Sequence, residues 1–96
     1  MRVISRKRLR DFVQTHADAS SPLDIWYRIA KKVAWNDLTD VQQAYSDAEY
    51  VAPKYTVFNI KGGHYRLIAV INFKYQMLYI REVLTHRDYD RKMWRK

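Results

Sequence analysis

Apolar side chains near the start of the chain recur three and four positions apart. Leu9, Phe12 and Val13 follow this spacing, which places them on one face of a helix and leaves the polar positions on the other. The pattern predicts a helix over residues 6–16. Ser5 stands directly before it and is of a type that commonly caps helices, so we expect Ser5 to be the cap.

A second helix is predicted to follow after a short break. We expect Ser21 to cap it, Pro22 to be its first residue and Val33 to lie near its end, because proline suits the first helical position. Its apolar face consists of Leu23, Trp26, Tyr27 and Ala30. This face should point to the interior of the domain.

A weaker helical pattern at residues 39–45 predicts a short helical turn. Asp37 and Asp40 lie at its start, and we interpret this carboxylate pair as a cap and a solvated turn rather than as an acid–base pair. Residues 46–54 are expected to form a loop, since Pro53 prevents a strand from starting sooner.

From residue 55 onward the pattern is that of β-strands. Residues 55–60 and 65–73 are rich in β-branched and aromatic side chains, and the turn between them contains two glycines that suit a hairpin. A third strand is expected at residues 77–84, followed by a short helical turn or tail from Thr85. Because residues 65–73 are apolar at successive positions, they are expected to form the central strand. The predicted fold class is α+β, with two N-terminal helices packed on an antiparallel sheet of about four strands.

Length and composition narrow the class of protein. With 96 residues and a mass of 11.6 kDa, residues 1–96 are expected to form a single domain. The chain has no cysteine, which excludes disulfides, zinc knuckles and thiol nucleophiles. Its longest unbroken apolar run has five residues, whereas about 20 are needed to cross a bilayer, and the basic N-terminus lacks the apolar core of a secretory signal. We therefore expect a cytoplasmic protein with no membrane partner.

Positive charge is concentrated in the second half of the chain. The formal net charge is +8; residues 1–53 carry 8 basic and 7 acidic side chains, and residues 54–96 carry 10 basic and 3 acidic ones. Such an imbalance favours a polyanionic partner, either nucleic acid or an acidic protein. An anionic membrane is a weaker alternative, because no basic amphipathic helix with an aromatic face is visible there.

Two arginines interrupt the predicted strands, Arg66 in the central strand and Arg81 in the last one. Each could be a solvated edge residue or a salt-bridge partner of Glu82 or Asp90. Alternatively, the two guanidinium groups form a clamp for a phosphate, since the planar fork of arginine binds two phosphate oxygens at once. The residues alone leave both interpretations open.

The segment after the last strand contains His86 and Tyr89, three residues apart. A helical turn would place both side chains on one face, close to Arg81 at the end of the strand. His86 could then take part in proton transfer, or it could hydrogen-bond Thr85 or Asp90 in a purely structural role. The residues leave this choice open as well.

The remaining histidines carry less information. His64, beside the glycine turn, is either a turn residue or a second proton-transfer group, and His16 is expected at the surface. The three histidines are 48 and 22 positions apart, which is not a metal-ligand spacing, so we expect no metal site.

The segment VFNIKGGHYRLIAVINF, followed by MLYIREVLTHRDYD, resembles the HigB family of bacterial toxins, a branch of the RelE-like toxins of type II toxin–antitoxin systems. The upstream segments IWYRIAKKVAW and DLTDVQQAYSDAEYV are similar to that family's second helix and to the loop that leads into its sheet. The resemblance covers nearly the whole chain. Residues 62–64 depart from the family's usual turn, in which Gly-Asn is followed by lysine or a similar residue.

The resemblance implies a RelE-like fold and a metal-independent endoribonuclease without a cofactor. Such toxins cleave mRNA, generally in the A site of the translating 30S/70S ribosome. The implied protein partner is a HigA-type helix-turn-helix antitoxin, and DNA would be contacted only indirectly, through the toxin–antitoxin complex.

Metal-free cleavage of RNA uses the 2′-hydroxyl as nucleophile, and the residues suit this chemistry. Arg66 and Arg81 are expected to neutralise the phosphate. His86 is the expected general acid or base, because the ordinary pKa of imidazole, about 6.5, makes both its protonated and its neutral form accessible. Tyr89 is expected to position the phosphate or to stack on a base. The expected substrate-binding residues are Lys61, His64, Arg87 and Asp90, of which Asp90 could also orient His86 or Arg81.

Two other functions remain compatible with the sequence. A non-catalytic RNA-binding or ribosome-binding module would have the same basic charge. A degenerate toxin that acts only as the partner of its antitoxin would keep the same fold.

Overall fold

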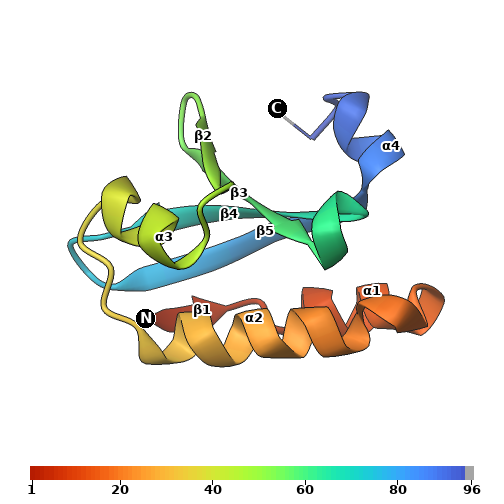
Figure 1. The fold of residues 1–96 in the computed structure, drawn as a ribbon, viewed down its shortest axis with the longest axis horizontal. Coiled ribbons are helices and arrows are strands. Elements are labelled where there is room, and N and C mark those ends of the chain that lie inside the picture. Colours follow the sequence, from red (N-terminus) through yellow and green to blue (C-terminus); the bar gives the residue numbers. More distant parts are fainter. Residues whose placement is uncertain (95–96) are drawn as a thin grey trace.

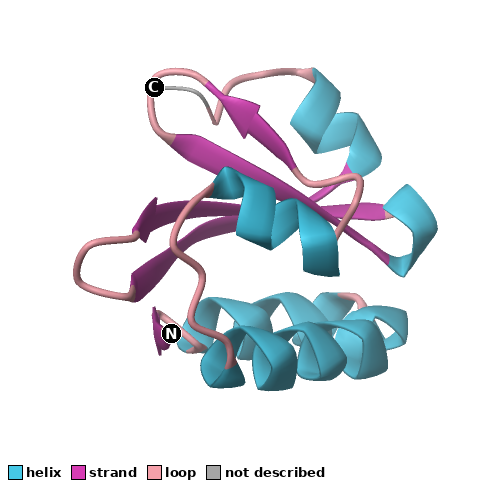
Figure 2. Cartoon of the chain, turned by 60° about the vertical axis from the view of Figure 1, so that its left-hand side comes forward, coloured by secondary structure: helices cyan, strands magenta, loops and turns pink. Residues whose placement is uncertain are grey.

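The computed structural model describes residues 1–94 and has two layers (Figure 1). In chain order, the elements are β1 (Arg2–Ile4), α1 (Lys7–Thr15), the 3₁₀ turn η1 (Ala17–Ala19), α2 (Ser20–Lys32), α3 (Leu38–Ala44), β2 (Glu49–Val51), β3 (Tyr55–Ile60), the 3₁₀ turn η2 (Lys61–Gly63), β4 (Tyr65–Asn72), β5 (Met77–Thr85) and α4 (His86–Asp90). Helices α1 and α2 lie side by side on one face of the sheet, and α4 lies on the opposite side (Figures 1 and 2). The expectation of an α+β fold is confirmed.

Within residues 1–94 the sheet has five strands in the order β1-β5-β4-β3-β2. Strands β2 to β5 form an antiparallel meander, with β4 in the centre as predicted, whereas β1 pairs with β5 in parallel. The sheet is therefore mixed and has one more strand than expected. Strand β2 lies within residues 46–54, so the prediction of a loop for this segment was wrong. Three residues paired at one edge are too few to produce an alternating pattern.

The starts of both long helices differ from the predicted caps. Ser5 has a positive φ of 75°, and the residue before α1 is Arg6, which makes no side-chain cap hydrogen bond. Ser21 lies inside α2, because η1 leads directly into the helix and Ala19 at its N-terminus already has helical backbone angles. A side-chain cap requires an extended residue at that position, so the serine pattern was misleading here.

Helix α3 begins as the sequence predicts. The Oδ1 atom of Asp37 accepts a hydrogen bond from the Asp40 amide at 3.0 Å, and the Oδ2 atom of Asp40 accepts one from the Asn36 amide at 2.9 Å. The two carboxylates thus satisfy backbone donors at the helix start. Their interpretation as a structural pair is confirmed.

The main core lies between the sheet and the helices. Phe58 of β3 is fully buried, and its ring packs against Trp26, Trp35 and Tyr45 at centroid distances between 5.4 and 6.2 Å. Leu67 and Ala69 of β4, together with Leu78 and Ile80 of β5, extend this core along the sheet. The apolar stripe predicted for α2 points into it. Among the described residues, no helix is long and apolar enough to cross a membrane.

A smaller apolar cluster covers the opposite face of the sheet. It is centred on Tyr55, Val57 and Ile68, and Tyr89 and Trp94 from the C-terminal segment pack onto it. Strand β4 is therefore covered on both faces, which explains its unbroken apolar sequence. Side chains alternate along a strand, so Arg66, two positions before Ile68, lies on this second face.

Strand β5 contains a bulge at Arg81. Ile80 pairs with Ala69 and Glu82 pairs with Ile68, so Arg81 is an additional residue without a partner in the ladder. A bulge interrupts the alternation of side chains and re-aims the extra residue. The side chain of Arg81 is exposed as a result.

Candidate active site

The turn between β3 and β4 gives the site its shape. Lys61, Gly62 and Gly63 have successive positive φ angles of 52°, 62° and 94°. The carbonyl of Gly63 points back to Arg66 and accepts a hydrogen bond from its Nη1 atom. A Cβ atom on Gly63 would lie 3.3 Å from that nitrogen, so glycine allows the guanidinium group to approach the backbone closely.

Arg66 also contacts the C-terminal helix. Its guanidinium carbon lies 5.4 Å from the centre of the Tyr89 ring, within the range of a cation–π interaction. The Tyr89 hydroxyl donates a hydrogen bond to Oε1 of Glu49 at 2.9 Å, and the Tyr89 ring stacks on Trp94 at 5.2 Å. Strands β2 and β4 and helix α4 therefore meet at Tyr89.

Helix α4 is held to the same turn through its backbone. Thr85 caps the helix, because its Oγ1 atom accepts a hydrogen bond from the Asp88 amide at 3.1 Å. The amide of His86 donates to the carbonyl of His64 at 3.1 Å. The glycine turn thus positions both Arg66 and the first residue of α4.

His86 contacts Asp90 within its helix. The Nδ1 atom of its imidazole lies 2.8 Å from Oδ2 of Asp90, and more than half of each side chain is exposed. This contact holds the ring by one nitrogen, so Nε2 is left for a substrate. The arrangement suits a group that transfers protons at the protein surface.

The structure does not bring every predicted site residue together. Arg66 contacts Tyr89, and His86 contacts Asp90 and the backbone of His64. The side chains of Arg81 and Arg87 are exposed and make no hydrogen bond or ion pair within residues 1–94. The described chain therefore contains a cluster with one cation–π contact and one histidine–carboxylate contact, together with two arginines whose side chains have no partner within it.

Lys61 is tied to the helical layer. Its Nζ atom lies 2.6 Å from Oδ2 of Asp18 in η1, and the hydroxyl of Tyr65 donates to Oδ1 of the same carboxylate, also at 2.6 Å. The hydrogen bond from Lys61, followed by that from Tyr65, lowers the pKa of Asp18 to about 2. The hydrogen bond to Asp18 in turn raises the pKa of Tyr65. This link fixes the glycine turn to the segment between α1 and α2.

His16 takes part in the same junction. Its ring stacks on Phe12 at a centroid distance of 4.1 Å and meets the edge of the Tyr65 ring at 5.5 Å. The side chain is half-buried, so the expectation that His16 lies on the surface was wrong. An aromatic neighbour one helical turn away can cover an imidazole, and the polarity of its flanking residues does not reveal this.

Glu49 is a site residue that sequence reasoning missed. It lies in β2, which the sequence analysis assigned to a loop, and its contact with Tyr89 spans forty positions of the chain. No local pattern signals such a contact. Among the described residues, no group of three histidine, aspartate or glutamate side chains is arranged to hold a metal ion.

Two helices packed on one face of a mainly antiparallel sheet fit the class of RelE-like toxins. The chain belongs to the HigB toxin family, described as the RelE-like toxic component of a toxin–antitoxin system, and the family model matches residues 19–92. The family resemblance of the sequence is thereby confirmed.

Curated relatives carry corresponding names. Over 37 residues, the chain is 49% identical to the mRNA interferase toxin HigB of Escherichia coli (strain K12), a match that covers 38% of this chain and 36% of that protein. The mRNA interferase HigB of Shigella flexneri matches to the same extent. The chain thus spans about a third of the length of these relatives. The mRNA interferase HigB of Escherichia coli O6:H1 is 22% identical over 93 residues, covering 95% of this chain and 90% of that protein.

Proposed function

We propose that this chain is an endoribonuclease toxin that cleaves mRNA. The observation that carries the proposal is the cluster at the start of β4 and α4, where Arg66 contacts Tyr89 and His86 contacts Asp90. Cleavage at a phosphate requires a positive charge near the phosphate and a group that transfers protons. The arginine and the oriented imidazole beside this turn provide them, and the tyrosine lies next to the arginine. The family and the names of the relatives support the same activity.

In the proposed reaction, the 2′-hydroxyl of the RNA attacks the adjacent phosphorus and the 5′-oxygen of the next nucleotide leaves. The 2′-hydroxyl loses a proton, the leaving oxygen gains one, and the phosphate carries extra negative charge in between. Arg66 stabilises that charge, and Nε2 of His86 exchanges one of the protons while Asp90 holds Nδ1. The products are a 2′,3′-cyclic phosphate and a 5′-hydroxyl.

The other predicted residues have supporting roles in this proposal. The exposed guanidinium of Arg81 supplies a second positive charge to the phosphate, and the exposed Arg87 binds the RNA backbone beside α4. Tyr89 positions the scissile phosphate through its hydroxyl or stacks on a base. Lys61 and His64 contribute to RNA binding at the turn, where Lys61 also shares its charge with Asp18.

The proposed partners follow from the same activity. The mRNA is bound in the A site of the translating ribosome in the cytoplasm, where a domain with a net charge of +8 is surrounded by RNA. A HigA-type helix-turn-helix antitoxin is the proposed protein partner, and DNA is contacted only through the complex of the two proteins. The family description, which places the toxin in a toxin–antitoxin system, supports an antitoxin as the protein partner.

End-group analysis of the cleaved RNA tests the proposal. The purified chain is added to translating ribosomes, and the new 5′ ends are assayed for ligation with and without prior phosphorylation. Ends that require phosphorylation carry a 5′-hydroxyl, as attack by the 2′-hydroxyl predicts. Directly ligatable 5′-phosphate ends would show that water is the nucleophile and would contradict the mechanism.

The concentration of basic residues in the second half also favours a second candidate, a non-catalytic RNA-binding or ribosome-binding module. In that case, the chain would bind ribosomes with an affinity that falls steeply with salt, and the RNA would remain intact. The same experiment separates the two functions.

A further inference from the structure

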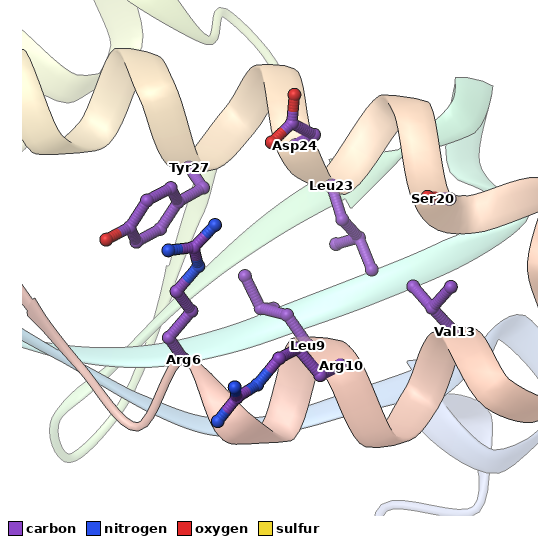
Figure 3. A pocket seen from close by; sticks show the side chains of 8 residues that line it. All are labelled: Arg6, Leu9, Arg10, Val13, Ser20, Leu23, Asp24 and Tyr27. Atoms are coloured by element: carbon purple, nitrogen blue, oxygen red, sulfur yellow. The ribbon is translucent and has the colours of Figure 1, made fainter.

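A groove runs between α1 and α2 on the helical side of the molecule (Figure 3). Its floor consists of Leu9, Val13 and Leu23, which point into the space between the two helices. Its volume is about 240 Å³ and it is open to solvent. Small-molecule pockets are usually larger and more enclosed, whereas a shallow groove of this size accommodates one or two side chains of a peptide.

The rim of the groove is strongly basic. Arg6, directly before α1, and Arg10 of α1 line it, and a neighbouring hollow along α2 adds Arg28, Lys31 and Lys32. The acidic residue on this surface is Asp24, and it is already paired with Arg28 at 3.0 Å. The side chain of Arg10 is exposed and makes no hydrogen bond or ion pair within the described chain. The rim therefore carries positive charge that residues 1–94 do not neutralise.

An apolar floor and a basic rim select for a particular kind of partner. RNA would match the charge, but the apolar floor offers no contact to its phosphates. The ring at this groove, Tyr27, is covered by the guanidinium of Arg6 at 4.3 Å and is not available to stack on a base. A second copy of the chain would bring five further cations to the same rim. A peptide segment with carboxylates beside aliphatic side chains satisfies both the floor and the rim.

We propose that the groove between α1 and α2 binds an acidic amphipathic segment of a partner protein. The groove lies on the helical face, whereas α4 and Tyr89 lie on the other side of the sheet (Figure 1). Occupying it leaves Arg66 and His86 uncovered. Identification of this partner with the antitoxin rests on the proposed function.

Binding of the purified antitoxin, the partner proposed above, tests the proposal without any measurement of RNA cleavage. Calorimetric titrations compare the wild-type chain with Arg10→Glu in the groove and with Lys74→Glu, an exposed lysine in the turn between β4 and β5. Arg10→Glu is expected to raise the Kd at least tenfold at low salt and less at high salt, whereas Lys74→Glu changes it less than twofold. Val13→Gln, which places an amide on the floor, is expected to weaken binding at all salt concentrations.

Several outcomes would overturn the proposal. They are an unchanged Kd for Arg10→Glu, an equal loss of affinity for Lys74→Glu, and no binding of the antitoxin to the wild-type chain. If Arg10→Glu instead abolishes RNA cleavage, or dissociates a dimer of the chain seen by light scattering, the groove binds RNA or a second copy. Failure of the proposed ribonuclease activity is recognised separately, because intact RNA would accompany normal antitoxin binding.

Discussion

The guanidinium carbon of Arg66 lies 5.4 Å from the centre of the Tyr89 ring, and this contact joins the central strand to the C-terminal helix. Arg66 is held on its other side by the carbonyl of Gly63, and the Tyr89 hydroxyl is held by Glu49. Both side chains are therefore oriented before a substrate arrives. A preorganised positive charge stabilises a transition state more than a mobile one, because little reorganisation is needed during the reaction.

Substitution of Arg66 should separate the effect of charge from that of shape. Arg66→Ala is expected to slow cleavage about 10²–10³-fold, the usual cost of losing a transition-state donor. Arg66→Lys keeps the charge but loses the planar fork, so its rate should lie between the two. Initial rates on ribosome-bound mRNA measure this, and circular dichroism checks the fold. Wild-type activity in Arg66→Ala would exclude Arg66 from the site.

The pair of His86 and Asp90 should behave as one unit. His86→Ala is expected to slow cleavage by about 10²–10⁴-fold if the imidazole transfers a proton in the rate-limiting step. Asp90→Asn should cause a smaller loss, because the amide can still contact Nδ1 but no longer stabilises a positive ring. Asp88→Asn, in the same exposed helix, is the matched control and should retain full activity. Equal activities of Asp90→Asn and Asp88→Asn would argue against an orienting role for Asp90.

The two glycines of the turn offer a paired test of the approach of Arg66 to the backbone. Both have positive φ, so alanine at either position should destabilise the protein by about 1–2 kcal/mol. A Cβ on Gly62 meets no atom within 4 Å, whereas one on Gly63 lies 3.3 Å from the guanidinium of Arg66. Gly63→Ala should therefore reduce cleavage about tenfold more than Gly62→Ala. Similar rates in the two variants would show that the position of Arg66 is not critical.

Asp18 should stabilise the fold near neutral pH and lose this effect in strong acid. The hydrogen bond from Lys61 lowers its pKa to about 2, compared with an ordinary value of 3.8. Because the folded-state pKa is the lower one, the contribution is fully present above about pH 4 and is lost as the pH falls through 2. Asp18→Asn should therefore show a smaller decrease in Tm between pH 4 and pH 2 than the wild type.

The matched control for this experiment is Asp11→Asn. Asp11 is also exposed, and its ion pair with Lys7 spans 4.0 Å on the surface of α1. Thermal melts followed by circular dichroism should give the same pH dependence for this variant as for the wild type. If Asp18→Asn also follows the wild-type curve, the link between η1 and the glycine turn does not stabilise the fold.

Strands β3, β4 and β5 could be predicted because their sequence pattern and their packing agree. Residues 55–60 were predicted with the bounds that β3 has, since a Gly-Gly turn follows a run of β-forming residues. The parallel pairing of β1 and the edge strand β2 could not be predicted in the same way. Each has only three residues, too few to show a periodicity. The partner of β1 is also distant in sequence, since Arg2 pairs with Met77.

Only the local contacts of the candidate site could be predicted from the sequence. His86 and Asp90 lie one helical turn apart, so their contact follows from local geometry once α4 forms. The contact of Tyr89 with Glu49 and the contact of Lys61 with Asp18 each join segments about forty positions apart. Such contacts depend on how the sheet and the helices pack, which a single sequence does not specify.

The bulge in β5 makes Arg81 a supernumerary residue. Ile80 already pairs with Ala69 and Glu82 with Ile68, so the ladder on either side of position 81 is complete without it. Deletion of this one codon would bring Ile80 and Glu82 together as ordinary neighbours, and every other pair of residues would keep its register. Relatives of this domain can therefore gain or lose a cation at this point of the sheet in a single genetic step, with no need to rebuild the core around it.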